Sequence, residues 1–297
     1  MSVLRPITIG HYLAFDEAQC RAAGKQLAET YQAADPFPHV VLDDFLPLEL
    51  LREAEQGFPS TNGRRYFDRD QERLKFQFDP SDSQSPLIRN LLAELNGRAF
   101  LGFLEELTGI RGLVSDPYFS GGGLHEIRRG GLLAVHADFN IHEEIKLERR
   151  LNVLIYLNEE WLPEFGGNLE LWDTKMQSCR TSVAPQIGRA VIFSTNLDSY
   201  HGHPDPLTCP PDRSRRSIAT YYYTALEQGL ASVPHRTTNF RVRPGTTDRT
   251  DWQVRRRHLA EDWTPPAVRR LARTARTRLA RIPLVRSIAA AVRRRPS

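Results

Sequence analysis

The chain has 297 residues, of which 40% are hydrophobic and 9% aromatic, with a formal net charge of +4, as expected for a globular protein of one large or two small domains. No window of eighteen apolar residues occurs and the start lacks a secretory signal pattern, so we expect a cytoplasmic protein without a transmembrane segment. The three cysteines, Cys20, Cys179 and Cys209, are odd in number and far apart, which argues against a disulfide framework and a cysteine zinc site.

The first part of the chain predicts mainly helices. Residues 11–34 have helical apolar spacing, and "FPHVVLDDFL" (37–46) is typical of a strand bounded by prolines. Helical spacing returns at 46–58. Residues 86–109 predict the longest helix, opened by Ser85 and Pro86 and interrupted or bent near Gly97.

From about residue 113 to residue 226 the pattern changes to seven or eight short β-rich runs at roughly ten-residue spacing, such as "LLAVHADF", "RLNVLIYLN" and "RAVIFST". Because no long helix separates these runs, they indicate a sandwich or barrel and not a Rossmann sheet. We therefore expect a mostly β core (113–226), an N-terminal support region of helices and a strand (1–112), and a C-terminal extension (227–297).

Two polar residues interrupt the apolar run 132–140, "LLAVHADFN". Side chains i and i+2 of a strand share a face, so His136 and Asp138 lie side by side. Taken alone, this pair is more typical of a buried histidine hydrogen-bonded to an aspartate than of two ligands of a metal. A ferrous site with open positions uses two histidines and one carboxylate, and His201 or His203 after the strand "RAVIF" could supply the third ligand.

The next strand, "RSRRSIATYYY", begins with arginines. A guanidinium near the metal pairs in a bidentate manner with a carboxylate, which suits a dicarboxylate that chelates iron at its other end.

In these motifs the sequence resembles the Fe(II)/2-oxoglutarate-dependent dioxygenases, prolyl 4-hydroxylase-like branch. The resemblance runs from "PFPHVVLDDFLP" through "GGLLAVHADFN", "LNVLIYLNEEW", "GGNLELWD" and "YHGHPDP" to "RRSIATYYYT" at residue 224. It implies a double-stranded β-helix, or jelly roll, with Fe(II) as the metal, 2-oxoglutarate and O2 as co-substrates, and ascorbate as a further reductant. The implied residues are metal ligands His136, Asp138 and His201, and 2-oxoglutarate-binding residues Arg215, Ser217 and Tyr156.

Two features bear on the reaction that the resemblance implies. Asp138 occupies the position that halogenating relatives leave to chloride, so we expect hydroxylation of an unactivated C–H with release of succinate and CO2. Ile127 and Arg128 stand where prolyl hydroxylases carry a tyrosine, which leaves the substrate open between a prolyl or other amino-acid residue and a small molecule. The alternatives are a non-catalytic metal-binding jelly-roll module and an adaptor that acts through its arginine-rich tail.

The C-terminal tail is strongly basic. Residues 254–297 contain thirteen arginines and two acids, a charge of +11 that leaves −7 for the rest of the chain. The pattern of 265–295 predicts an amphipathic helix that contacts an anionic membrane or a polyanion, or that docks on the acidic body. The protein would then be cytoplasmic or peripheral at a membrane, and the sequence indicates no oligomeric state.

Overall fold

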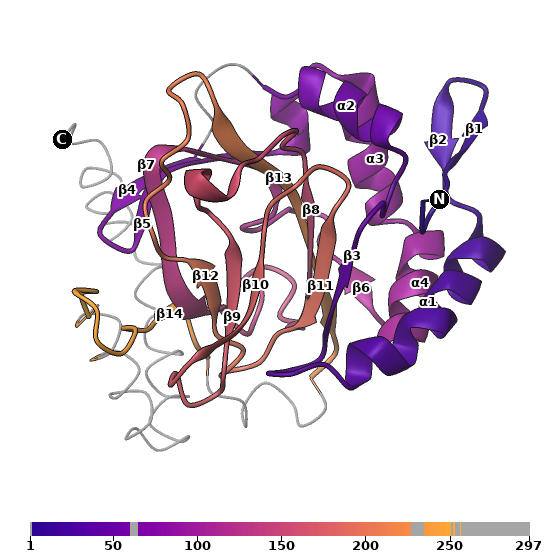
Figure 1. Ribbon diagram of the computed structural model, residues 1–297. Helices are drawn as coiled ribbons and strands as arrows, with labels where there is room; N and C mark the ends of the chain where they lie inside the picture. Colours follow the sequence, from indigo (N-terminus) through magenta and orange to yellow (C-terminus); the bar gives the residue numbers. More distant parts are fainter. Residues whose placement is uncertain (1, 60–64, 227–234, 251, 253–255, 257–297) are drawn as a thin grey trace, which may run out of the picture. The chain divides into compact units, whose positions relative to one another are not determined.

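The computed structural model describes residues 2–59, 65–226, 235–250, 252 and 256 (Figure 1). The chain divides into two units, and the description that follows concerns the first, Met1–Leu226 with His235–Asp251. The predicted amphipathic helix of 265–295 lies outside the described residues. No helix among the described residues is long and apolar enough to span a membrane.

The first helix, α1 (Glu17–Gln32), is shorter than predicted. Within the range predicted as helix from residue 11, β2 (Tyr12–Ala14) instead pairs with β1 (Ile7–Ile9) in a small hairpin. The helix begins where it does because the Asp16 side chain accepts a hydrogen bond from the Gln19 amide at 2.7 Å, a helix N-cap.

The predicted interruption at Gly97 is confirmed, since 86–109 forms two helices, α3 (Pro86–Leu95) and α4 (Arg98–Thr108). Gly109, with φ +74°, ends α4 in the left-handed conformation that favours glycine. α2 (Leu48–Gln56) also forms as expected, and the short 3-10 helices η1 (Pro80–Asp82) and η2 (Pro163–Phe165) complete the described helical segments.

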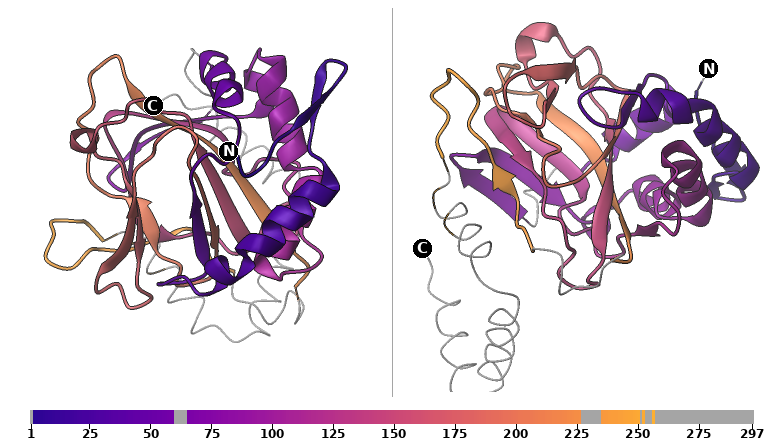
Figure 2. Two further views of the ribbon diagram at one scale, coloured as in Figure 1. Left: turned by 45° about the vertical axis from the view of Figure 1, so that its right-hand side comes forward. Right: turned by 90° about the horizontal axis from the view of Figure 1, so that it is seen from below.

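The described strands of the core are all antiparallel neighbours, in the order β10-β9-β12-β7-β13-β8-β11-β3. The sheet curls into a nearly closed jelly roll, with the helices packed on one outer side (Figure 2). The predicted mostly β fold with flanking helices is therefore confirmed. The strands are β3 (His39–Leu42), β4 (Arg65–Arg69), β5 (Glu72–Phe78), β6 (Val114–Ser115), β7 (Gly123–Ala137), β8 (Glu148–Tyr156), β9 (Leu169–Trp172), β10 (Cys179–Val183), β11 (Ala190–Ser194), β12 (His201–His203), β13 (Ser214–Thr224) and β14 (Asn239–Phe240).

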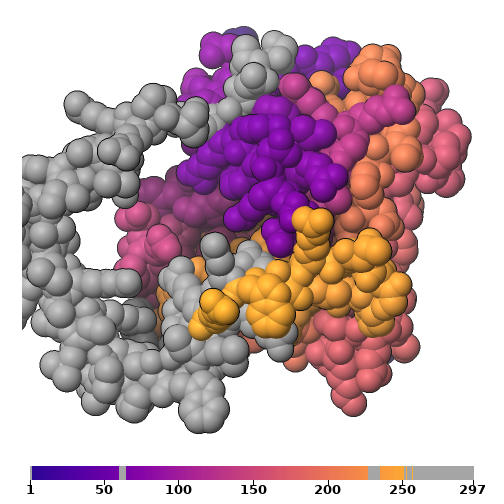
Figure 3. Space-filling model, turned by 90° about the vertical axis from the view of Figure 1, so that its left-hand side faces the viewer, coloured from indigo at the N-terminus to yellow at the C-terminus, as the bar shows by residue number. Residues whose placement is uncertain are grey.

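Two differences from the sequence prediction shape the cavity of the jelly roll. The run "LLAVHADF", predicted as a short strand, belongs to the long strand β7, which begins at Gly123. The unpredicted hairpin β4–β5 pairs with β7, and β14 pairs with the end of β7. On the face shown in Figure 3 this hairpin lies against 235–250, where Arg249 approaches Asp70 at 3.3 Å.

Alternation along the strands separates an apolar outer face from a polar inner one. On β8, Leu151, Val153 and Ile155 belong to the large core cluster shared with α1, α3 and α4. The intervening Asn152 and Leu154 line the interior cavity. The helices thus complete the hydrophobic core, and the inner face is free to carry charged and polar groups.

Candidate metal centre

Three candidate ligands predicted from the sequence meet at one end of the cavity. His136 is directly opposite His201 in the pairing of β7 with β12, and their ring centres are 4.5 Å apart. Asp138 follows β7, with Oδ1 3.5 Å from His136 Nε2 and Oδ2 3.5 Å from His201 Nε2. One ligand atom from each residue lies within 4.8 Å of the others, so the group could hold a metal ion.

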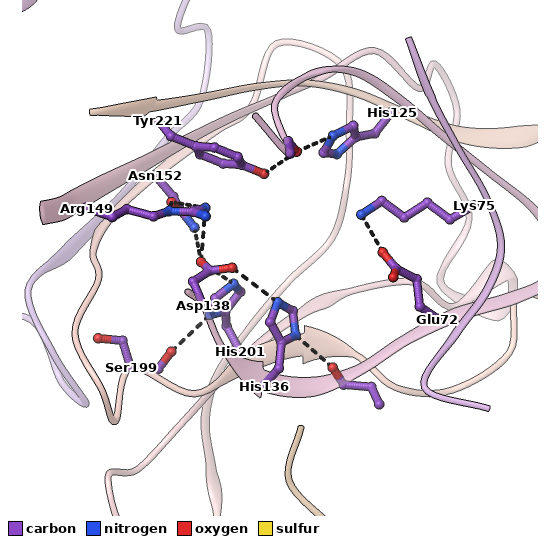
Figure 4. A network of polar contacts seen from close by, with 12 residues as sticks. Glu72, Lys75, His125, His136, Asp138, Arg149, Asn152, Ser199, His201 and Tyr221 are labelled. Carbon is purple, nitrogen blue, oxygen red and sulfur yellow. Dashed lines mark hydrogen bonds and ion pairs between the residues drawn. The ribbon is translucent and has the colours of Figure 1, made fainter. Parts of the chain in front are cut away.

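Both imidazoles are oriented by the main chain. His136 Nδ1 lies 2.8 Å from the Ala134 carbonyl oxygen, and His201 Nδ1 lies 3.0 Å from that of Ser199. Since a carbonyl can only accept, each Nδ1 carries the proton and each Nε2 keeps a lone pair toward Asp138 (Figure 4). Burial lowers the pKa of His201 to about 4, which favours this neutral form.

Asp138 is compensated by a buried arginine. Arg149 Nη2 lies 3.1 Å from Asp138 Oδ2, and Asn152 donates a 2.8 Å hydrogen bond to the same oxygen. Arg149 in turn donates to Asn152 and lies over the ring of Tyr221, 3.6 Å from its centre. Although burial raises the pKa of Asp138, the charge of Arg149 outweighs this effect and holds the pKa well below its usual range.

A second cation lies deeper, on the inner face of β13. Arg215 is 5% exposed; its Nε donates to the Gly167 carbonyl at 2.8 Å and its Nη2 to the Tyr156 hydroxyl at 3.2 Å. Ser217 is buried directly opposite Tyr156 in the sheet. Within the described part of the chain no carboxylate pairs with Arg215, and burial lowers its pKa.

The two candidate distal histidines differ in position. His201 faces Asp138, whereas His203 is displaced by a register shift and lies opposite Leu133. His203 is 3% exposed, and neither of its ring nitrogens has a hydrogen-bond partner. It lines the same cavity, so it is a buried polar group whose hydrogen-bonding capacity is unmet by the protein.

The structure adds residues that the motifs did not indicate. Arg149 and Asn152 were missed, although an isolated asparagine inside the apolar run "LNVLIYL" was a usable signal. Lys75 and Glu72 were missed because the β4–β5 hairpin was not predicted. Ile127 lines the cavity.

The cavity has a volume of about 200 Å³. Because roughly 10–15 Å³ of such volume holds one water molecule, it accommodates a ligand much larger than water. It extends from the candidate ligands to Arg215 on one side and to β5 on the other.

Residues 122–223 match the family model of the 2OG-Fe(II) oxygenase superfamily. This segment, which contains all six predicted site residues, is therefore similar to that superfamily. No curated protein sequence matches the chain.

Several solved structures are similar to the chain. A prolyl-4-hydroxylase from Pseudomonas putida is 20% identical, with 68% of this chain and 98% of that one covered and a TM-score of 0.44. A Trichoplax adhaerens prolyl hydroxylase in complex with a hypoxia inducible factor peptide is 16% identical (69% and 91% covered, TM-score 0.48). HygX from Streptomyces hygroscopicus, with nickel, 2-oxoglutarate and hygromycin B bound, is 12% identical (67% and 87%, TM-score 0.46).

Proposed function

We propose that the protein is an Fe(II)- and 2-oxoglutarate-dependent hydroxylase. The substrate C–H becomes C–OH, one atom of O2 entering the product and the other entering succinate as 2-oxoglutarate loses CO2. His136, Asp138 and His201 are the proposed metal ligands, and Arg215, Tyr156 and Ser217 the proposed 2-oxoglutarate site. The substrate is a peptide residue or a small molecule.

The observation that carries this proposal is the uncompensated guanidinium of Arg215 in the same cavity as the two histidines and the aspartate. A buried charge without a partner costs several kcal/mol, on the order of 3–5 kcal/mol for one left by removal of its partner, so the site is built to receive an anion. A module that used its metal only for structure would have no need of this cation. 2-Oxoglutarate, with a carboxylate at each end, satisfies both the metal and Arg215.

The chain's own groups prepare this chemistry before any ligand arrives. Main-chain carbonyls fix the two imidazoles with Nε2 free, and Arg149 and Asn152 keep Asp138 ionised and oriented. Tyr156 and Gly167 hold the Arg215 fork in place, so little orientation remains to be lost when a carboxylate binds. Bound Fe(II) would supply the activation of O2.

The metal assignment is tested by anaerobic addition of Fe(II) and 2-oxoglutarate to the purified full-length protein. We expect the weak visible charge-transfer band of the chelate, and we expect it to be lost in His136→Ala and His201→Ala. The exposed His11 provides the matched control, and His11→Ala should keep the band. A folded, metal-loaded protein without the band refutes the proposal.

The 2-oxoglutarate site is tested by exchanging adjacent arginines. Arg216 points away from the cavity and pairs with Glu55 at 2.6 Å. Arg215→Met should weaken 2-oxoglutarate binding by about 10- to 100-fold, the equivalent of about 1.5–3 kcal/mol for a hydrogen bond to a charged group, whereas Arg216→Met should change it little. Titration of the visible band measures both, and equal effects would place the co-substrate elsewhere.

A further inference from the structure

Lys75 is placed unlike the other lysines of the chain. Four of the 40 lysine and arginine residues are lysines, and Lys25, Lys146 and Lys175 are exposed. Lys75 is only 9% exposed and lies on β5, with its side chain directed into the cavity across from Asp138 (Figure 4). Arg149 and Arg215, the other buried cations of the cavity, carry guanidinium groups, whereas this position carries a compact ammonium.

The ammonium of Lys75 is fixed by one hydrogen bond and has further N–H donors available. Its Nζ donates to Glu72 Oε1 at 2.8 Å and lies 5.4 Å from the centre of the Phe67 ring. Glu72 is 6% exposed and also pairs with Arg69 Nη2 at 2.8 Å, so this carboxylate is shared between two cations. The group of three carries one net positive charge, and the ammonium keeps donors for another acceptor.

The charges that line the cavity indicate which kind of molecule it accepts. The interior of the cavity carries three cationic side chains and two carboxylates. A fourth cation, Arg69, lies at the edge of the cavity, with a side chain that is 54% exposed. The two charges of Fe(II) and the two of 2-oxoglutarate cancel, so at least one positive charge stays uncompensated after both are bound. A neutral substrate would leave that charge buried, at a cost. The interior ions are Lys75, Arg149 and Arg215 as cations and Glu72 and Asp138 as anions.

We propose that Lys75 binds the carboxylate of a small carboxylic acid, which is the substrate hydroxylated at the centre opposite. This inference rests on the proposed function and names the substrate class for it. A monoanionic carboxylate matches the single net charge of the group better than a phosphate dianion, which Glu72 would repel. The cavity of about 200 Å³ also has to hold 2-oxoglutarate, which favours a small acid over a peptide residue with a neutral backbone.

The unpartnered imidazole of His203 is a second, independent feature that indicates a polar ligand. Both of its nitrogens are buried without a partner, and the side chain lines the same cavity as Lys75. A ligand with only apolar groups would leave these nitrogens unsatisfied, whereas an acid with a further polar substituent can reach them.

The test measures succinate release by the full-length protein with Fe(II), 2-oxoglutarate and O2 in the presence of each of the twenty L-amino acids and its C-terminal amide. Each pair differs in the carboxylate alone. We expect at least one acid to stimulate release about 10- to 100-fold more than its amide, the range for one hydrogen bond to a charged group. In Lys75→Met the KM for that acid should rise by a similar factor, so that acid and amide become nearly equal. Lys25→Met, the exposed control, should keep both the preference and the basal turnover.

Other outcomes would overturn the inference. A panel in which no acid exceeds its amide refutes a carboxylate site, and stronger stimulation by O-phosphoethanolamine assigns Lys75 to a phosphate. If Lys75→Met raises the KM for 2-oxoglutarate as much as the KM for the acid, Lys75 binds the co-substrate and not the substrate. If Lys75→Met does not fold, the double variant Lys75→Met with Glu72→Gln is measured instead. The second substitution removes the carboxylate charge that the first leaves buried without its lysine partner. Failure of the proposed function is distinguishable, because neither the visible band nor any succinate would then form.

Discussion

Arg149 offers the sharpest test of how the candidate metal centre is stabilised before it binds a metal. Replacement by methionine keeps an unbranched apolar stem like that of arginine. It removes the ion pair to Asp138 at 3.1 Å and both hydrogen bonds to Asn152. The side chains of Arg149 and Asp138 are 2% and 11% exposed, so solvent cannot replace what is lost.

The expected cost follows from this burial. Breaking a buried ion pair by removing one partner costs about 3–5 kcal/mol. Asp138 keeps the hydrogen bond from Asn152, so the lower end of about 3 kcal/mol applies. With a denaturant slope of about 3 kcal/mol/M in urea, the unfolding midpoint of the metal-free protein should fall by about 1 M. The neighbouring Arg150 binds the Thr224 hydroxyl at 3.2 Å, and Arg150→Met should cost less than about 1 kcal/mol.

The same experiment with Zn(II) bound tests whether metal and arginine compensate the same carboxylate. A divalent ion at the three ligands supplies positive charge to Asp138, so Arg149→Met should cost less in the zinc-loaded protein than in the metal-free one. Urea unfolding of both variants with and without Zn(II) measures the difference. Equal costs for Arg149→Met and Arg150→Met, or a cost unaffected by zinc, would refute this account of the site.

Three further predictions concern other parts of the molecule. His203→Val removes two unsatisfied buried nitrogens and should stabilise the metal-free protein by about 1–3 kcal/mol in urea unfolding; a loss of stability would contradict it. Gly24→Ala places a Cβ 2.3 Å from the Phe103 carbonyl oxygen, so α1 and α4 must separate, and we expect a thermal destabilisation of about 1–3 kcal/mol. Burial raises the pKa of Glu72, but the charges of Lys75 and Arg69 outweigh it, so the pKa is lowered. The ionised Glu72 therefore stabilises the folded protein above the unfolded pKa of about 4.3, and this contribution is lost as the pH falls through the folded pKa. The unfolding free energies of wild type and Glu72→Gln should thus differ at pH 7 and converge in acid, and a gap that persists at the lowest pH would disprove the assignment.

The sequence predicts well where periodicity or capping determines the structure. Along β8 and β13 the side chains alternate between the cavity and the outside, so that Arg215 lines the cavity and Arg216 pairs with Glu55 outside it. The helix start at Ser85 and Pro86 and the break at Gly97 could be predicted because each is determined by residues adjacent in the sequence. The candidate ligands were found because short motifs preserve their spacing, and their ligation stays a prediction for the experiments above.

The parts that the sequence did not predict depend on contacts between distant segments. The β4–β5 hairpin has mixed charged and aromatic residues without clean alternation, and it is a strand pair only because β7 offers an edge to it. Lys75 therefore gave no signal as a cavity residue. Residues 11–14 carry helical spacing, but the Asp16 cap starts α1 later and the segment pairs with β1 instead.

The orientation of the two imidazoles by main-chain carbonyls has a consequence for how the cavity can change. One end of the cavity is specified by backbone hydrogen bonds, which survive most substitutions nearby. The hairpin 65–78, in contrast, contributes to the cavity through side chains, among them Phe67, Glu72 and Lys75. If the proposed function holds, replacing this hairpin should change which substrate is accepted and leave the reaction type unchanged, because the two depend on separate segments of the chain.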